Sequence, residues 1–211
     1  MKLFIGVCNS QDTVPAAFHW SWEEMDKPYE YQKERFANDD AIIRNNRMVR
    51  DFLRSDCDIL VKMDIDQIYP KNYFTVMVPL VEEYKVIGPL IHNKHRRNQY
   101  APLLCARNTF PIVRTITNWE PMAVDGILEI PYAHTNLFYA REAIEKTKPP
   151  WYESKYSHDN CAHRMNRDYS FIGKLRKQGF NTYININVEV GHLVEGVVNS
   201  ETNRLWQHER R

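Results

Sequence analysis

Short apolar stretches alternate along the chain with stretches whose apolar residues recur at helical spacing. Residues 2–8, KLFIGVC, and residues 58–63, DILVKM, predict two buried strands. Between them, residues 39–55 carry apolar side chains near every third or fourth position, and Asp39 or Asp40 can cap the start of that helix. Strands that alternate with helices predict an α/β fold with a mixed, mostly parallel central sheet flanked by helices.

The second half of the chain continues this alternation. Further strands are expected at residues 86–88, 136–139, 182–186 and 188–190. Further helices are expected from Pro70, at residues 141–146 and at residues 168–178. Gly179 follows the last of these helices, where a residue in the left-handed conformation commonly ends a helix. Residues 92–126 are rich in Pro, Asn and Arg and are interpreted as active-site loops.

The composition is that of a folded domain. With 211 residues and 43% hydrophobic content, we expect a single domain over residues 1–211, either complete or as the N-terminal domain of a longer protein. The net charge of +1 argues against a general nucleic-acid-binding protein. The basic segment 94–97 is interpreted as either a solvated loop or a local binding patch.

Targeting signals and cysteines bear on the compartment. No apolar run is long enough to cross a membrane, and the N-terminus lacks the pattern of a signal peptide, so we expect a cytoplasmic protein. The four cysteines are widely spaced and form no C-x-x-C pair, which indicates reduced thiols in a reducing compartment.

The stretch ILVKMDIDQIYP, residues 59–70, ends a predicted strand with Asp64 and Asp66. In a parallel sheet, ligands bind beyond the carboxyl ends of the strands. A second Asp-x-Asp, formed by Asp56 and Asp58, precedes the same strand, where solvated charges are expected in a turn. Position therefore favours Asp64 and Asp66 as the ligand-binding pair, and a solvated strand end is the alternative.

Two neighbouring carboxylates repel each other unless a proton or a cation lies between them. Carboxylate oxygens suit Mg²⁺ or Mn²⁺, ions that commonly also bind substrate phosphates. His192 follows another predicted strand and Gly191, and a nitrogen ligand favours Mn²⁺. The alternative for His192 is a buried histidine that is satisfied by hydrogen bonds.

Two segments carry a resemblance to a known family: NNRMVRDFLRSDCDILVKMDIDQIYP (45–70) and NRDYSFIGKLRKQGFNTYININVEVGHL (166–193). In this order and spacing the chain resembles the GT-A glycosyltransferases, particularly family-2-like enzymes and their relatives in phages and large DNA viruses. The resemblance implies a GT-A, Rossmann-like fold. It also implies transfer of a sugar from a UDP-sugar, with UDP-glucose as one option, to a hydroxyl of a glycan or glycoprotein such as a capsid protein.

The resemblance also implies roles for individual residues. Asp64 would lie near the ribose of the donor and the metal, Asp66 would bind the metal directly, and His192 would be a further metal ligand. Asn9 and Arg47 would lie near the nucleotide.

Lys62 is a further candidate on the nucleotide side, with a solvent-pointing lysine as the alternative. Asp168 matches the acceptor-side aspartate that serves inverting members as general base, and it is equally suited to cap the following helix. The family commonly has Glu before this aspartate, whereas this chain has Arg167, which suits a salt bridge. Trp151 and Tyr152 are expected either to stack on an acceptor sugar or to pack in the core.

Three other functions compete with glycosyl transfer. A sugar nucleotidyltransferase would want a glycine-rich loop after the first strand, and CNSQDTVP has no glycine. An aspartate-nucleophile phosphatase would place its Asp-x-Asp after the first strand. A non-catalytic module on the same fold would bind a glycan or a protein partner without Mn²⁺ or nucleotide.

Overall fold

The computed structural model describes residues 1–9, 13–37, 40–92, 104–109, 112–115, 122–133, 136–156, 163–165, 167–193 and 197–198. Its helices are α1 (Ala16–Glu24), α2 (Ala41–Arg54), α3 (Tyr73–Tyr84), α4 (Arg141–Glu145) and α5 (Arg167–Lys177). The strands of the main sheet are β1 (Lys2–Cys8), β2 (Glu30–Phe36), β3 (Ile59–Asp64), β4 (Gln67–Ile68), β5 (Val86–Ile91), β8 (Ile127–Ile130), β10 (Phe138–Ala140), β13 (Thr182–Leu193) and β14 (Val197–Val198).

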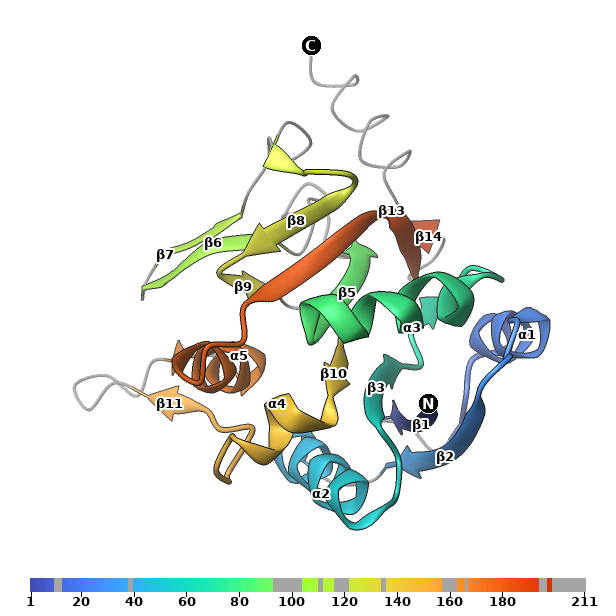
Figure 1. Cartoon of the computed structure of the whole chain (residues 1–211), viewed down its shortest axis with the longest axis horizontal. Coiled ribbons are helices and arrows are strands. Elements are labelled where there is room, and N and C mark those ends of the chain that lie inside the picture. Colours follow the sequence, from blue (N-terminus) through green and yellow to red (C-terminus); the bar gives the residue numbers. More distant parts are fainter. Residues whose placement is uncertain are drawn as a thin grey trace.

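The main sheet is mixed, and its longer strands run in one direction. Its order is β14-β13-β5-β10-β3-β1-β2 (Figure 1). β1 pairs in parallel with β2 and β3, and β13 pairs in parallel with β5. β10 lies antiparallel between β3 and β5, so those two strands share a direction. The prediction of a mixed, mostly parallel α/β sheet is confirmed.

Helices cover both faces of this sheet, as Figure 1 shows. On one face α1 and α3 pack on alternate strand residues such as Ile59, Val61 and Met63. On the other face α2, α4 and α5 pack on the intervening residues, including Leu60. Because side chains alternate along a strand, Lys62 belongs to the second face together with Leu60.

Close packing brings α2 to the end of β1. A Cβ atom at Gly6 would lie 2.3 Å from Met48 Sδ, so a larger residue would require the Met48 side chain to shift. Asp40 caps α2 as predicted, since its Oδ1 accepts a hydrogen bond from the Ile42 amide at 2.8 Å. The helix therefore presents Asn45 beside Cys8, with 3.4 Å between Asn45 Oδ1 and Cys8 Sγ.

Other predicted boundaries change. The expected strands at 182–186 and 188–190 form one strand, β13, with a register shift between Asn185 and Glu189 where it runs along β5. Gly179 ends α5 with φ +88°, as predicted. β2 was not predicted because its sequence, EYQKERF, is polar, as an edge strand permits.

The remaining described strands form two smaller sheets. The expected irregular segment 92–126 contains β6 (Leu104–Thr109) and β7 (Ile112–Thr115), which form a sheet with β9 (Tyr132–Ala133). β11 (Lys155–Tyr156) pairs with β12 (His163–Met165). No helix in the described ranges is long and apolar enough to cross a membrane. The basic segment 94–97 lies outside the described residues, while Cys8 and Cys57 are buried free thiols.

Candidate functional site

The carboxyl ends of several main-sheet strands meet at one edge. Asn9 follows β1, Asp64 ends β3, and Cys8 and Asp64 lie opposite each other in the β1–β3 pairing. After β3 the chain turns back into β4, which pairs antiparallel with the end of β13 and sets Gln67 opposite His192. The Leu193 amide also donates to the Asp66 carbonyl at 2.8 Å. The strand pairing thus brings Asp66 to His192.

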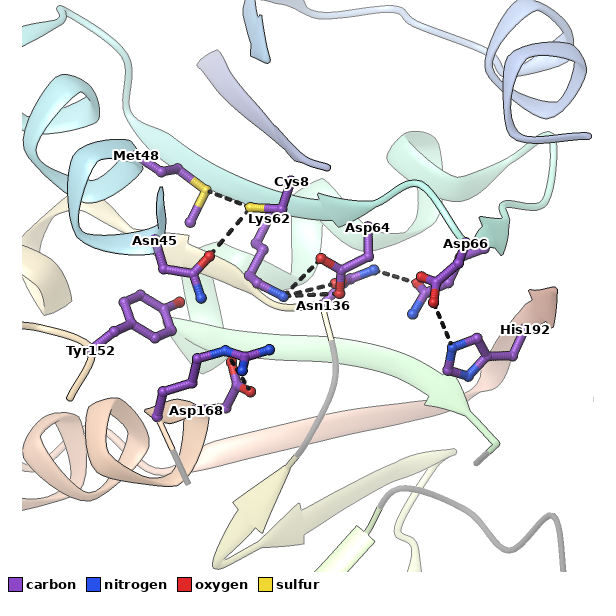
Figure 2. A network of polar contacts seen from close by, with 12 residues as sticks. Cys8, Asn45, Met48, Lys62, Asp64, Asp66, Asn136, Tyr152, Asp168 and His192 are labelled. Carbon is purple, nitrogen blue, oxygen red and sulfur yellow. Dashed lines mark hydrogen bonds and ion pairs between the residues drawn. The ribbon is translucent and has the colours of Figure 1, made fainter. Parts of the chain in front are cut away.

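Asp66 and His192 form the first part of the site. His192 Nε2 lies 3.3 Å from Asp66 Oδ2, and His192 Nδ1 lies 2.9 Å from the backbone oxygen of His92 (Figure 2). A carbonyl oxygen only accepts hydrogen bonds, so Nδ1 carries the proton and donates to His92. In the neutral ring, Nε2 then turns its lone pair toward a carboxylate oxygen.

That arrangement suits a cation. A lone pair that faces a carboxylate is unfavourable unless a proton or a metal ion lies between the two atoms. Adjacent ligands of an octahedral ion with bonds of about 2.1 Å are roughly 3.0 Å apart, close to the observed 3.3 Å between Nε2 and Oδ2. A backbone carbonyl that fixes the opposite ring nitrogen is the usual support of a metal-binding histidine. Asp66 and His192 therefore fit one edge of a coordination sphere.

The described residues hold no group of three or more His, Cys, Asp or Glu side chains arranged for a metal. The expected set of Asp64, Asp66 and His192 is thus drawn together only in part, because Asp64 faces a different partner. Two protein ligands remain compatible with Mg²⁺ or Mn²⁺, which commonly complete their coordination with water and substrate phosphates.

The partner of Asp64 is Lys62. Lys62 Nζ lies 3.1 Å from Asp64 Oδ1 and 2.9 Å from Asp64 Oδ2 (Figure 2). Lys62 is 6% exposed, so it does not point to solvent, which corrects the alternative considered for it. Burial alone would lower the pKa of Lys62, but the negative charges of Asp64 and Asp168 outweigh it and raise the pKa. Lys62 is therefore a buried cation.

Asn136 joins this ion pair to the turn that carries Asp66. Its Oδ1 accepts from Lys62 Nζ at 3.3 Å, and its Nδ2 donates to Tyr69 Oη at 2.6 Å and to Gln67 Oε1. With the amide turned around, its nitrogen would instead donate to Asp64 Oδ2 at 2.8 Å. In either orientation this fully buried amide connects the end of β3 to β4.

Asp168 lies on the other side of Lys62. It sits in the first turn of α5, which already begins at Arg167, so Asp168 is inside the helix and not at its cap. Its side chain is buried, with Arg167 Nε 3.9 Å from Asp168 Oδ2, and Figure 2 shows it facing the same interior as Lys62. Its charge also reaches Cys8, whose thiol pKa burial raises to about 12.

Asn9 and Arg47, the two other residues expected on the nucleotide side, differ in burial. Asn9 is fully buried, and its Nδ2 donates to the Thr13 carbonyl at 3.3 Å, which ties the chain after β1 back to the strand. Arg44 Nη1 donates to the Asn9 carbonyl at 2.9 Å. Arg47, one turn further along α2, is exposed. Arg44 therefore contacts the residue that follows β1.

The remaining aromatic candidates are packed in the core. Trp151 and Tyr152 are 9% and 1% exposed, which favours packing over stacking on a sugar. Asn46 Oδ1 accepts from both backbone amides, at 2.8 and 3.1 Å, and its Nδ2 donates to the Tyr152 carbonyl at 2.7 Å. Asn46 thus anchors this loop to α2.

Sequence reasoning missed three residues of the polar network: Gln67, Tyr69 and Asn136. Gln67 and Tyr69 directly follow the aspartates, so their place after the strand was a usable signal. Asn136 comes just before β10, whose antiparallel direction brings its start to the edge where β3 and β5 end. That direction was not visible in the sequence.

Comparison with known proteins adds information on the fold. No protein-family model and no curated protein matches the chain. The crystal structure of A197 from STIV is similar over 92% of this chain and 86% of that chain, with a TM-score of 0.61 and 17% identity. Two structures of UDP-glucose pyrophosphorylase, one apo and one with UDP-glucose, match at 9% identity with TM-scores of 0.46 and 0.43. Each match covers 87% of this chain, and the matched parts are 66% and 67% of the two pyrophosphorylase chains.

At 17% identity the likeness to A197 shows a shared fold alone, and the two weaker matches carry no argument. The chain therefore has the fold of A197 from STIV.

Proposed function

We propose that this chain is a metal-dependent glycosyltransferase that moves a sugar from a UDP-sugar to a hydroxyl of a glycan or glycoprotein. The observation that supports it best is the Asp66–His192 pair beside Asp64, at the edge where parallel strands end. A carboxylate and a correctly oriented imidazole suit Mn²⁺, and the open coordination positions suit a diphosphate.

On the donor side, Asp66 and His192 would hold the ion, and Asp64 would lie between the ion and the ribose. The ion would neutralise the charge that develops on the leaving nucleoside diphosphate. Asn9 would act by shaping the chain after β1, since its side chain is buried and bonded to Thr13. Arg47 would reach the nucleotide from the exposed face of α2.

On the acceptor side, Asp168 would accept the proton of the attacking hydroxyl as its oxygen bonds to the anomeric carbon. The bond from that carbon to the diphosphate oxygen breaks, and UDP leaves with the bonding electrons. Lys62 and Arg167 both lie near Asp168 and favour its ionised form, which a general base requires. Arg167 therefore supports the base assignment as well as a salt bridge.

Thermal unfolding with UDP, GDP and CMP, each with and without Mn²⁺, tests the proposal. A ligand that binds only the native state at a hundredfold excess over its Kd stabilises it by about 2.7 kcal/mol. We expect UDP with Mn²⁺ to raise the Tm and UDP alone to raise it little. Transfer from UDP-glucose to an acceptor glycan is then measured as UDP release.

The competing functions give different results in the same assay. A non-catalytic module would show no stabilisation with any nucleotide and Mn²⁺. A nucleotidyltransferase would release pyrophosphate from UTP with a sugar phosphate and would not release UDP from UDP-glucose. Either result would replace the proposed function.

A further inference from the structure

The two aspartates of the pair start from different electrostatic conditions. Both oxygens of Asp64 lie within 3.1 Å of the buried Lys62 ammonium. Asp66 lies beside a histidine and is 38% exposed. Asp64 is thus already neutralised by an internal cation, whereas Asp66 lies beside the imidazole of His192.

A divalent cation that bound at this site without a diphosphate would lie close to the positively charged Lys62 ammonium. With His192 neutral, three aspartates (Asp64, Asp66 and Asp168) and two basic residues (Lys62 and Arg167) carry one net negative charge, so a divalent ion alone would leave a net positive charge in a partly buried site. Arg44 adds positive charge on the same side, as its effect on Cys8 shows. Charges at such short range interact strongly when water is partly excluded. The anionic diphosphate of a donor would remove this excess.

We propose that Lys62 makes cation binding at this site conditional on the diphosphate, so that the chain takes up the metal and the donor together and holds the free metal weakly. The inference rests on the proposed function and adds an order of binding to it. Lys62 is a positioning residue in this scheme, because it acts on the metal through Asp64.

The buried ammonium also has a second counter-charge when Asp64 turns toward an ion. The negative charge of Asp168 already acts on Lys62. Releasing Asp64 therefore does not leave Lys62 without a nearby carboxylate, which would otherwise be costly in the interior.

Equilibrium dialysis of Mn²⁺ against the intact chain measures the effect directly, because nucleotide–metal complexes that are not bound to protein equilibrate across the membrane. The probes are UDP, inorganic pyrophosphate and uridine. We expect UDP and pyrophosphate to strengthen Mn²⁺ retention on the order of tenfold or more, and uridine to leave it unchanged. Equal retention with uridine, with UDP and with no addition would overturn the inference.

Variants at Lys62 test whether its positive charge makes Mn²⁺ binding depend on the diphosphate. Lys62→Met should retain free Mn²⁺ about tenfold more tightly than the wild type and lose most of the gain from pyrophosphate. Lys62→Arg keeps the charge and should keep the conditional binding. Lys33→Met is the matched control, since it removes the same charge from exposed β2. Free Mn²⁺ retention by Lys62→Met that equals that of Lys33→Met would overturn the assignment.

Failure of the inference and failure of the proposed function look different. Tight wild-type binding of free Mn²⁺, with further binding of UDP, overturns the inference and leaves the glycosyltransferase standing. Absence of Mn²⁺ retention with every nucleotide, in the wild type and in Lys62→Met, overturns both. Loss of the thermal transition would show that Lys62→Met does not fold. In that case the wild-type comparison of pyrophosphate with uridine still tests whether Mn²⁺ retention depends on a diphosphate.

Discussion

Asp66 and Asp168 represent two regions of the site that are built in different ways. Asp66 lies on the turn between β3 and β4, is partly exposed, and meets His192 through backbone pairing of β4 with β13. Asp168 lies in the first turn of α5 and is buried, and its charge acts on Lys62 because that helix packs on the same face of the sheet. One carboxylate is placed by strand register and the other by helix packing.

Under the proposed function, this difference gives the two carboxylates different tasks. A partly exposed carboxylate beside an imidazole can take up an ion and a diphosphate from solution. A buried carboxylate near Lys62 and Arg167 has a fixed charge and little access to water, which suits a proton acceptor for one positioned hydroxyl. Lys62 lies between the two regions and is bonded to Asp64, so it is the group through which they interact.

The largest expected effect separates the two regions by removing the base. Asp168→Asn keeps the shape and removes the charge, and we expect transfer to fall about 10²–10⁴-fold, the usual contribution of general-base catalysis. Binding of UDP with Mn²⁺ should remain, because Asp66 and His192 are unchanged. UDP release from UDP-glucose measures the first property and thermal shift the second. Asp51→Asn removes a partly exposed carboxylate of α2 that pairs with Arg50, and it controls for the loss of a carboxylate. Near-normal transfer by Asp168→Asn would rule out the base.

A somewhat smaller effect is expected from the other region. Asp66→Asn should lose the Mn²⁺-dependent stabilisation by UDP and lower transfer about 10²–10³-fold, as losing one electrostatic contact to the developing charge commonly does. The matched control is Asp56→Asn in the other Asp-x-Asp, whose carboxylate binds Lys2 on the surface at 2.7 Å. Equal loss of Mn²⁺ response in both variants would show that position after the strand does not matter.

The region placed by strand register was the part of the site that could be predicted from the sequence. Alternating strands and helices imply a mostly parallel sheet, and parallel strands deliver their carboxyl ends to one edge. That argument relates Asp66 to His192 across more than a hundred residues without any knowledge of side-chain contacts. It also separates this pair from Asp56 and Asp58, which lie at the opposite end of β3.

The burial of Lys62 could also have been predicted from the sequence, although a solvent-pointing lysine was considered as the alternative. A strand covered by helices on both faces has no solvent side, so a lysine in its middle has to be buried and needs a partner. Asp64, two residues along and on the same face, is that partner.

The region placed by helix packing could not be predicted from the sequence. The electrostatic interaction of Asp168 with Lys62 depends on where α5 packs. Hydrophobic spacing in a helix fixes its buried face but not its position on a sheet. Asn136 was hidden for a related reason, since the antiparallel direction of the three-residue strand β10 has no local signal. The polar edge strand β2 lacked the apolar alternation that identifies strands.

The smallest expected effect tests whether the network around Asn136 joins the two regions. Asn136→Ala removes a buried amide that contacts Lys62, Gln67 and Tyr69, and leaving such groups unpaired costs roughly 1–3 kcal/mol in the free energy of unfolding. Urea denaturation measures this cost. Because the same amide fixes the β3–β4 turn, we also expect UDP with Mn²⁺ to bind about tenfold more weakly, in the range seen when support around a metal ligand is lost. Asn46→Ala, which loses backbone contacts at Trp151 and Tyr152, is the control of similar chemistry on α2. If both variants lose stability but bind the nucleotide as the wild type does, Asn136 supports the fold alone, and the two regions act independently.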